Sequence, residues 1–311
     1  MNDLLMIIRQ IILLALGFFM LVKGADWFVE GAAGIARKFG IPQLVVGLTI
    51  VAMGTSAPEA AVSITAALKD NAGITIGNVV GSNILNILII LGITVLITNI
   101  AIQKSTFMIE IPCMIGVTIL LIFLGNSGEV ITFAEGVVFW ILFLVYLVYL
   151  YQLSKKGEAE NQVEERNSIR LLVIGAIGGI IVVLGSNVTV DSATKIAKIM
   201  GMSERFIGLT IVALGTSLPE LVTSVSAAKK GNADIAIGNI VGSNIFNILF
   251  VIGTSALITP VVYESKFILD GVIAVAAGVL LWVAVYRKRE LRRPWGVVML
   301  MGYAGYFLYL I

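Results

Sequence analysis

Two glutamates lie within long apolar segments of the chain, in nearly identical surroundings. Glu59 belongs to the segment GLTIVAMGTSAPEAAVSITAALK, and Glu220 belongs to GLTIVALGTSLPELVTSVSAAKK. A carboxylate in such a segment costs on the order of 2.5–3.5 kcal/mol if the segment spans a membrane, so it needs a compensating partner. Neither segment has a basic residue near its glutamate. The compensation must therefore come from other groups.

Oxygen atoms are abundant around each glutamate. At helical spacing, the hydroxyls expected near its face are Thr55, Ser56 and Ser63 for Glu59, and Thr216, Ser217 and Ser224 for Glu220. A proline directly precedes each glutamate and obstructs the carbonyl one turn back, so we expect the carbonyls of Ala52 and Ala213 to lack partners within their own helices. Such hard oxygen ligands suit Na⁺ and Ca²⁺. The two segments predict a cation site.

A second polar cluster follows each glutamate segment. It reads GNVVGSNILNI at 77–87 and GNIVGSNIFNI at 238–248. Within each cluster a serine and an asparagine are four residues apart and share a helix face, namely Ser82 with Asn86 and Ser243 with Asn247. The remaining amides, Asn78, Asn83, Asn239 and Asn244, are expected to cap broken helix ends or to bind ions.

The composition requires a membrane around these segments. Of the 311 residues, 59% are hydrophobic and only 13% are charged, and the mean hydropathy is +1.02, which is too apolar for a soluble domain. Long apolar runs without alternation favour helices over a barrel. At about 20 residues per span, ten spans use roughly 200 positions. We therefore expect an all-α integral membrane protein of ten helices, in contact with the lipid bilayer.

Several functions are disfavoured by the same composition. The net charge is only +2 and no soluble basic segment is present, so we expect no nucleic-acid partner. The chain has no histidine and one cysteine, Cys113, which excludes an internal disulfide and the usual zinc clusters. No Ser/Lys, Asp/Asp or His/Glu catalytic arrangement stands out, so we expect no enzyme activity, no bound cofactor and no specific protein partner.

The chain is an internal duplication. At an offset of 161 residues, Gly47–Gly92 aligns with Gly208–Gly253 without a gap, and 30 of the 46 positions are identical. Each half divides into five apolar segments, and an odd number of spans makes the second copy enter the membrane from the opposite side. We expect a first five-helix repeat over 1–153, a polar cytoplasmic linker over 154–170 and an inverted second repeat over 171–311.

Basic residues set the expected orientation. Of the Lys and Arg residues, 14 fall on one side of the ten predicted spans and 6 on the other, with Lys23 inside the first span. The richer side should be cytoplasmic, which places both termini outside a plasma membrane.

Other charged residues near the spans do not require a role in ion binding. We expect Glu110, Glu129 and Glu135 to be solvated or interfacial at span ends, and Lys23 to pair with Asp26 or to reach towards the membrane surface.

The paired GTSxPE and GNxxGSN segments resemble the two α-repeats of the cation/calcium exchanger superfamily, in its prokaryotic sodium/calcium exchanger branch. The resemblance implies a core made of the second, third, seventh and eighth spans, across which the long first and sixth spans slide. It also implies the following ligands: the carbonyl of Ala52, the side chains of Thr55, Ser56, Glu59, Ser82 and Asn86, and their repeats Ala213, Thr216, Ser217, Glu220, Ser243 and Asn247.

One departure from that pattern bears on the choice of ions. Some archaeal and potassium-dependent members carry aspartate where this chain has Asn247, and the GNxxE signature of the calcium/proton branch is missing here. The resemblance therefore favours exchange of Na⁺ for Ca²⁺. Ca²⁺/H⁺ exchange and potassium-dependent exchange remain alternatives, and a passive cation channel lined by the two glutamates is a third.

Overall fold

The computed structural model describes residues 2–69, 73–156, 168–201 and 213–310, and this part is almost entirely helical. The elements of the first half are α1 (Asn2–Phe39), α2 (Gln43–Val46), the π-helical turn η1 (Gly47–Val51), α3 (Ala52–Thr55), α4 (Ala57–Leu68), α5 (Gly73–Leu85), η2 (Asn86–Leu91), α6 (Gly92–Ile97), β1 (Ile100–Ala101), η3 (Thr106–Glu110), α7 (Ile111–Gly128), β2 (Val130–Ile131) and α8 (Phe133–Lys156).

The described elements of the second half follow a similar order, but no π-helical turn precedes α15 as η3 precedes α7. Its described elements are α9 (Ser168–Ile199), α11 (Ala213–Thr216), α12 (Leu218–Lys229), α13 (Ala233–Phe246), η5 (Asn247–Ile252), α14 (Gly253–Ile258), β3 (Val261–Val262), α15 (Lys266–Tyr286), β4 (Glu290–Leu291) and α16 (Arg293–Leu310).

The described residues contain seven helices that are long and apolar enough to cross a membrane, or eight if the bent pair formed by 43–55 and 57–68 is one span. A helical membrane protein is therefore confirmed, and the number ten stays a prediction. Helix α8 runs to Lys156 and α9 starts at Ser168, so both ends of the predicted linker are helical. The rest of the linker, 157–167, lies outside the described residues.

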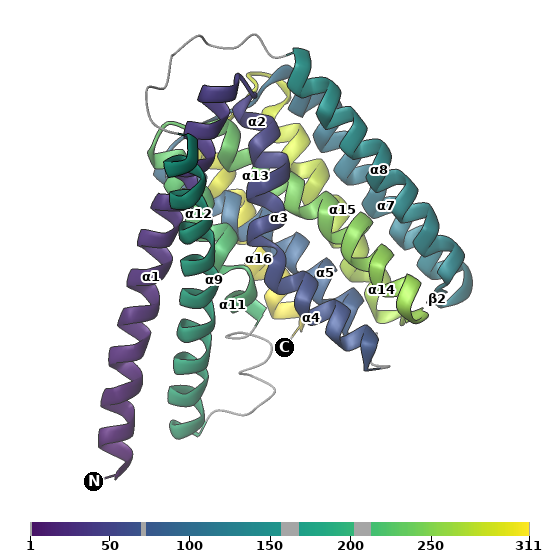
Figure 1. Ribbon diagram of the computed structural model, residues 1–311. Coiled ribbons are helices and arrows are strands. Elements are labelled where there is room, and N and C mark those ends of the chain that lie inside the picture. The colour runs from purple at the N-terminus through teal and green to yellow at the C-terminus, as the bar shows by residue number, and fades with distance from the viewer. Residues whose placement is uncertain (1, 70–72, 157–167, 202–212, 311) are drawn as a thin grey trace.

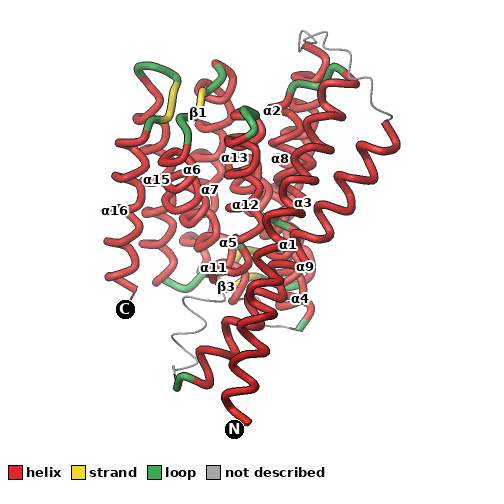
Figure 2. Tube along the Cα trace, turned by 90° about the vertical axis from the view of Figure 1, so that its left-hand side faces the viewer, coloured by secondary structure: helices red, strands yellow, loops and turns green. Residues whose placement is uncertain are grey.

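The two longest helices, α1 and α9, pack side by side at one edge of the molecule (Figure 1). They run antiparallel, because Gly17 lies against Gly185 and Gly31 lies against Gly175. A β-carbon added at Gly178 would lie 2.4 Å from the backbone nitrogen of Phe28, so only glycine allows this approach. Both helices extend beyond the others at the end that carries the N-terminus (Figures 1 and 2).

Helix α13 lies at the centre of the bundle. Every residue from Ile235 to Phe246 is buried, which explains why this segment, apart from Asn239 and Asn244, is apolar or small on all faces instead of amphipathic. A β-carbon added at Gly242 would lie 2.8 Å from Leu48 Cα, so α13 lies directly against η1 of the other half. The halves share one core.

Two short antiparallel strand pairs also join the halves outside the helices. β1 pairs with β4, with Ile100 opposite Leu291, and β2 pairs with β3, with Val130 opposite Val262. Each pair satisfies backbone groups between consecutive helices, where a buried chain would otherwise leave them unpaired. The chain ends lie at the same end of the bundle in Figure 2.

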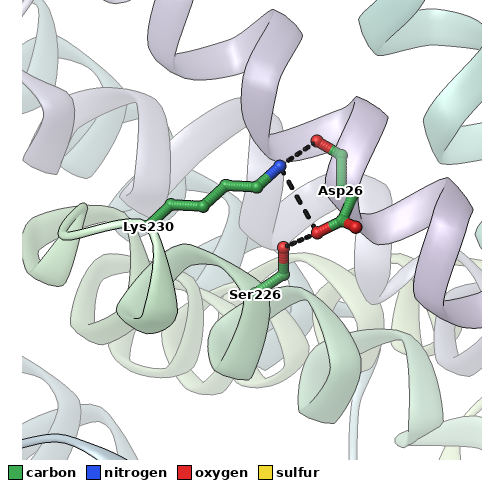
Figure 3. A network of polar contacts seen from close by, with 3 residues as sticks. All are labelled: Asp26, Ser226 and Lys230. Carbon is green, nitrogen blue, oxygen red and sulfur yellow. Dashed lines mark hydrogen bonds and ion pairs between the residues drawn. The ribbon is translucent and has the colours of Figure 1, made fainter.

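Helix α1 is also attached to the core by a polar contact (Figure 3). Ser226 on α12 donates a hydrogen bond of 2.7 Å to Asp26 Oδ1. Lys230 Nζ lies 3.3 Å from the same oxygen and donates to the Asp26 carbonyl at 2.7 Å. The close ion pair of Asp26 is therefore formed with Lys230, and Lys23 adds an electrostatic interaction with Asp26. Lys230 is 204 residues away, beyond the reach of helical spacing.

Of the three acids assigned to span ends, one is placed differently from the expectation. Glu129 is exposed, and Glu135 accepts a hydrogen bond of 2.7 Å from the Thr132 amide at the start of α8. Glu110 is fully buried, and the hydroxyl of Tyr149 on α8 donates to its carboxylate. The expectation of a solvated Glu110 is wrong, because this side chain of η3 is fully enclosed and is contacted by Tyr149 from α8.

Candidate cation site

Each glutamate segment is broken at the serine before its proline. Ser56 has φ −81° and ψ 7°, and Ser217 has φ −89° and ψ 4°, which is outside helical geometry. The first broken segment bends by 51° at its break. Because a new helix starts after each break, Glu59 and Glu220 lie in the first turns of α4 and α12, where free amides favour negative charge.

The break frees a different carbonyl from the one expected. The Ala52 carbonyl accepts the backbone amide of Ser56 at 3.0 Å, so the expectation that it lacks a partner in its own helix is wrong. The reason is register, because a proline at 58 removes the donor for the carbonyl four residues earlier, at Gly54. In the second half the corresponding carbonyl, that of Gly215, accepts a hydrogen bond of 2.7 Å from Ser186 on α9.

The hydroxyls at the two breaks cross over to the opposite glutamates. Ser56 Oγ donates to Glu220 Oε1 at 2.8 Å, and Ser217 Oγ donates to Glu59 Oε1 at 3.3 Å. Both carboxylates are buried, with exposed fractions of 0% for Glu59 and 1% for Glu220. The Glu220 charge acts electrostatically on Glu59. Two repelling carboxylates with no basic partner among the described residues form a centre that attracts cations.

The following helices complete the surroundings of the glutamates. Ser82 on α5 lies 3.5 Å from Glu59 Oε1, and Ser243 on α13 donates to the Ala52 carbonyl at 3.3 Å. Asn86 and Asn247 are the first residues of the π-helical turns η2 and η5. Such turns are uncommon and often occur at functional sites, where they change the direction of a side chain.

Two further asparagines orient Asn86 and Asn247. Asn86 Nδ2 donates to Asn244 Oδ1 at 2.9 Å, and Asn247 Nδ2 donates to Asn83 Oδ1 at 3.1 Å. Asn83 and Asn244 also donate to each other's backbone carbonyls, at 3.1 and 3.2 Å. Because the amide nitrogens of Asn86 and Asn247 are occupied, their Oδ1 atoms are left to face other partners.

The last pair of asparagines holds the backbone of the glutamates. Asn78 Nδ2 donates to the Glu59 carbonyl at 3.2 Å and to Ser63 Oγ at 2.9 Å. Asn239 repeats this, donating to the Glu220 carbonyl at 3.4 Å and to Ser224 Oγ at 2.9 Å. Asn239 Oδ1 accepts a hydrogen bond of 2.9 Å from Thr55 Oγ1. Ser63 and Ser224 are thus partners of these amides, and not of the carboxylates as their helical spacing suggested.

Four buried oxygens of this cluster have no hydrogen-bond donor: Glu59 Oε2, Glu220 Oε2, Asn86 Oδ1 and Asn247 Oδ1. Buried acceptors without donors are costly, and each half of the chain contributes two of them. Among the described residues no group of three His, Cys, Asp or Glu residues could hold a metal. The donor set is therefore carboxylate, amide and hydroxyl oxygen, which fits hard cations such as Na⁺ and Ca²⁺.

The structure brings together nearly all the residues predicted from the sequence. Thr55, Ser56, Glu59, Ser82, Asn86, Ser217, Glu220, Ser243 and Asn247 are all buried in this cluster. Thr216 is half-buried and interacts with Glu59. Ala213 begins α11, directly after residues 202–212, which lie outside the described part of the chain.

The fold and the cation site define a class of membrane protein in which two related halves enclose a site for hard cations. A family profile described as "Sodium/calcium exchanger protein" matches residues 9–152 and 170–311. This match supports the same class. The chain therefore belongs to the sodium/calcium exchanger family of membrane cation antiporters.

Individual relatives agree over nearly the whole chain. It is 40% identical over 308 residues to the putative antiporter CaxA of Alkalimonas amylolytica, covering 95% of this chain and 96% of that protein. It is 32% identical to the sodium/calcium exchanger MaX1 of Methanosarcina acetivorans, covering 98% and 99%. A solved structure of the sodium-calcium exchanger NCX_Mj matches with a TM-score of 0.85 and 34% identity, covering 98% of this chain and 99% of that one.

Proposed function

We propose that the protein exchanges Na⁺ for Ca²⁺ across the membrane at the site between Glu59 and Glu220. The observation that carries this proposal is the set of four buried oxygens without donors, two from each half of the chain. The two carboxylates match the charge of one Ca²⁺ or most of the charge of several Na⁺ ions. The relatives named as sodium/calcium exchangers support the same pair of ions.

Coupling in this proposal comes from competition. The two ion types need the same glutamates, so the site holds either Ca²⁺ or Na⁺ and the gradient of one drives the other. The ligands are the residues predicted from the sequence: Ala52, Thr55, Ser56, Glu59, Ser82, Asn86, Ala213, Thr216, Ser217, Glu220, Ser243 and Asn247. Exchange requires that the site open alternately to the two sides of the membrane. A part of the protein must therefore move relative to this site.

The helices α1 and α9 are the candidates for that movement. They form a pair along one edge of the bundle (Figure 1), and Ser186 on α9 already bonds the carbonyl freed by the second break. We propose ten spans in two inverted repeats in a plasma membrane. The basic side, which includes Lys155 and Arg289, faces the cytoplasm, and both termini face outwards.

Uptake of Ca²⁺ by proteoliposomes tests the exchange. Vesicles loaded with Na⁺ and diluted into Na⁺-free buffer should accumulate Ca²⁺, and collapsing the Na⁺ gradient should stop the uptake. Glu59→Gln and Glu220→Gln should each nearly abolish it, while the matched variant Glu129→Gln, at an exposed acid, should not. Uptake that ignores the Na⁺ gradient would refute the proposal, and a pH dye would then reveal whether protons are the coupling ion.

A further inference from the structure

Glu110 is a third carboxylate buried in the helical bundle, away from the cation site. Its side chain has no exposed surface, and it ends η3, the π-helical turn just before α7. The Tyr149 hydroxyl on α8 donates to Glu110 Oε1, whereas Oε2 has no hydrogen-bond partner. Burying a carboxylate with one oxygen that accepts no hydrogen bond costs free energy, so this arrangement needs an explanation.

Two other polar atoms near Glu110 are also buried without partners. They are Oγ1 of Thr106, which begins the same π-helical turn, and the hydroxyl of Tyr146. Tyr146 is next to Tyr149 on α8, with ring centroids 6.4 Å apart, and it interacts electrostatically with Glu110. Glu110 therefore lies in a buried polar cluster made by the start of α7 and the last turns of α8.

The backbone around Glu110 has the same irregularity as the cation site. Of the four π-helical turns in the described residues, η1 ends just before Ala52, while η2 and η5 begin with Asn86 and Asn247. The fourth is η3, which precedes Pro112, and its Phe107 carbonyl accepts the indole N–H of Trp282 on α15 at 3.1 Å. Three of the four turns thus adjoin the cation site, and the remaining one positions a buried glutamate.

The described part of the chain provides no cation for this glutamate. Among the described residues no Lys or Arg forms an ion pair with it. The titratable groups that interact with it are Tyr146, Tyr149 and Cys113, none of which supplies positive charge.

The acids on the adjoining helices have other partners. Asp270 on α15 accepts from Tyr306 at 3.0 Å, and Asp234 on α13 accepts from Gln103 at 2.6 Å. Tyr286 on α15 packs its ring against Phe107. A buried carboxylate without a counter-ion is costly, and binding a proton would remove that cost.

We propose that Glu110 binds a proton on Oε2, which makes it a proton site separate from the cation site. The two oxygens then have distinct roles: Oε1 is the carbonyl that accepts from Tyr149, and Oε2 carries the hydrogen. Thr106 Oγ1 and the Tyr146 hydroxyl are the free acceptors for that hydrogen. Tyr149 is seven residues before the end of α8 at Lys156, so the proton site lies about 10 Å along α8 from the end of that helix.

One contact links this proton site to the cation site. Met114 lies one helical turn after Glu110 on α7, and its sulfur accepts a hydrogen bond of 3.5 Å from Asn244. Asn244 in turn orients Asn86. In this proposal, the proton on Glu110 also influences cation binding, through the contact between Met114 and Asn244.

Infrared difference spectroscopy tests the proton directly. The protein is reconstituted in lipid with Glu59→Gln and Glu220→Gln, which removes the two carboxylates of the cation site, and spectra are compared between acidic and alkaline buffer. We expect loss of a carboxylic-acid C=O band at alkaline pH, and its absence after Glu110→Gln. Tyr149→Phe should move this band to higher frequency, because the carbonyl loses its hydrogen bond. That variant keeps the test valid if Glu110→Gln does not fold.

Two results would overturn the proton site. One is a difference spectrum that is unchanged by both Glu110→Gln and Tyr149→Phe. The other is a carboxylate band of Glu110 that responds to added Na⁺, K⁺ or Ca²⁺ but not to pH, which would assign a metal ion.

The link is tested by titrating Ca²⁺ binding at several pH values with Glu59 and Glu220 intact. Glu110→Gln should change the pH profile of the half-saturating Ca²⁺ concentration, and Glu129→Gln should leave it unchanged. A Glu110→Gln profile that superimposes on that of the unmodified protein would refute the link.

Discussion

Ser56 and Glu220, 164 residues apart in the chain, are joined by a hydrogen bond of 2.8 Å between the two broken segments. The reciprocal bond, from Ser217 to Glu59, is 3.3 Å long. Each carboxylate is therefore held by the half of the chain that does not contain it. This exchange makes the cation site a property of the two repeats together, although Ser82 of the first half also bonds Glu59.

Ser56→Ala should weaken Ca²⁺ binding. The hydroxyl both orients Glu220 and offers an oxygen ligand, and a hydrogen bond to a charged group is worth about 1.5–3 kcal/mol, which corresponds to a loss of affinity of roughly 10- to 150-fold. Ser217→Ala should behave alike, and both are measured by calorimetric titration. The matched control is Ser127→Ala, which removes an exposed hydroxyl bonded only within its own turn. Unchanged affinity in Ser56→Ala would remove this serine from the ligand set.

Asn83 and Asn247 should show energetic coupling. Asn83→Ala takes away the acceptor of the buried Asn247 amide, and an unsatisfied buried donor costs about 1–3 kcal/mol of stability. Asn247 is then free to rotate, so Ca²⁺ affinity should fall as well. In a double-mutant cycle with Asn247→Ala, the two losses of thermal stability should not add. Additive losses would contradict the contact, and Asn99→Ala, at an exposed amide, should leave both quantities unchanged.

The duplication explains why so much of the site was predictable. Glu59 with Ser56 and Glu220 with Ser217 occur in matching apolar segments, and the cost of burying a carboxylate there points to a functional role for both acids. The helix break at the GTSxPE motif was also predictable, because proline cannot continue a hydrogen-bonded helix.

What the sequence could not supply were contacts between distant segments. The orienting role of Asn83 depends on Asn247, 164 residues away, and the burial of Glu110 depends on Tyr149 on another helix. Helical spacing reports only which side chains share a face. The signal that could have identified the Asn83 and Asn244 pair is their identity at equivalent positions of the two repeats.

Gly178→Ala should loosen the attachment of α1 to α9. The added β-carbon would lie 2.4 Å from the Phe28 backbone nitrogen, and such overpacking typically costs 1–3 kcal/mol. We expect a lower melting temperature and slower transport, because the two helices could no longer move as a close pair. Gly116→Ala is the matched control, since its β-carbon would meet no atom within 4 Å. This substitution should leave the stability unchanged or raise it slightly. Equal melting temperatures for both variants would contradict the packing.

Lys230→Met should alter turnover while leaving Ca²⁺ affinity unchanged. The ammonium attaches α1 to α12 through Asp26 (Figure 3) but contacts none of the proposed ligands. Both side chains are about a third exposed, at 34% and 37%, and exposed pairs contribute about 0.2–1 kcal/mol. The maximum rate of Ca²⁺ uptake should therefore change by no more than about fivefold, and high ionic strength, which screens the pair, should reduce the difference. Lys229→Met, at the adjacent exposed lysine, should leave the maximum rate of Ca²⁺ uptake unchanged. A changed Ca²⁺ affinity in Lys230→Met would mean that this contact acts on the ion site itself and not on the movement of α1.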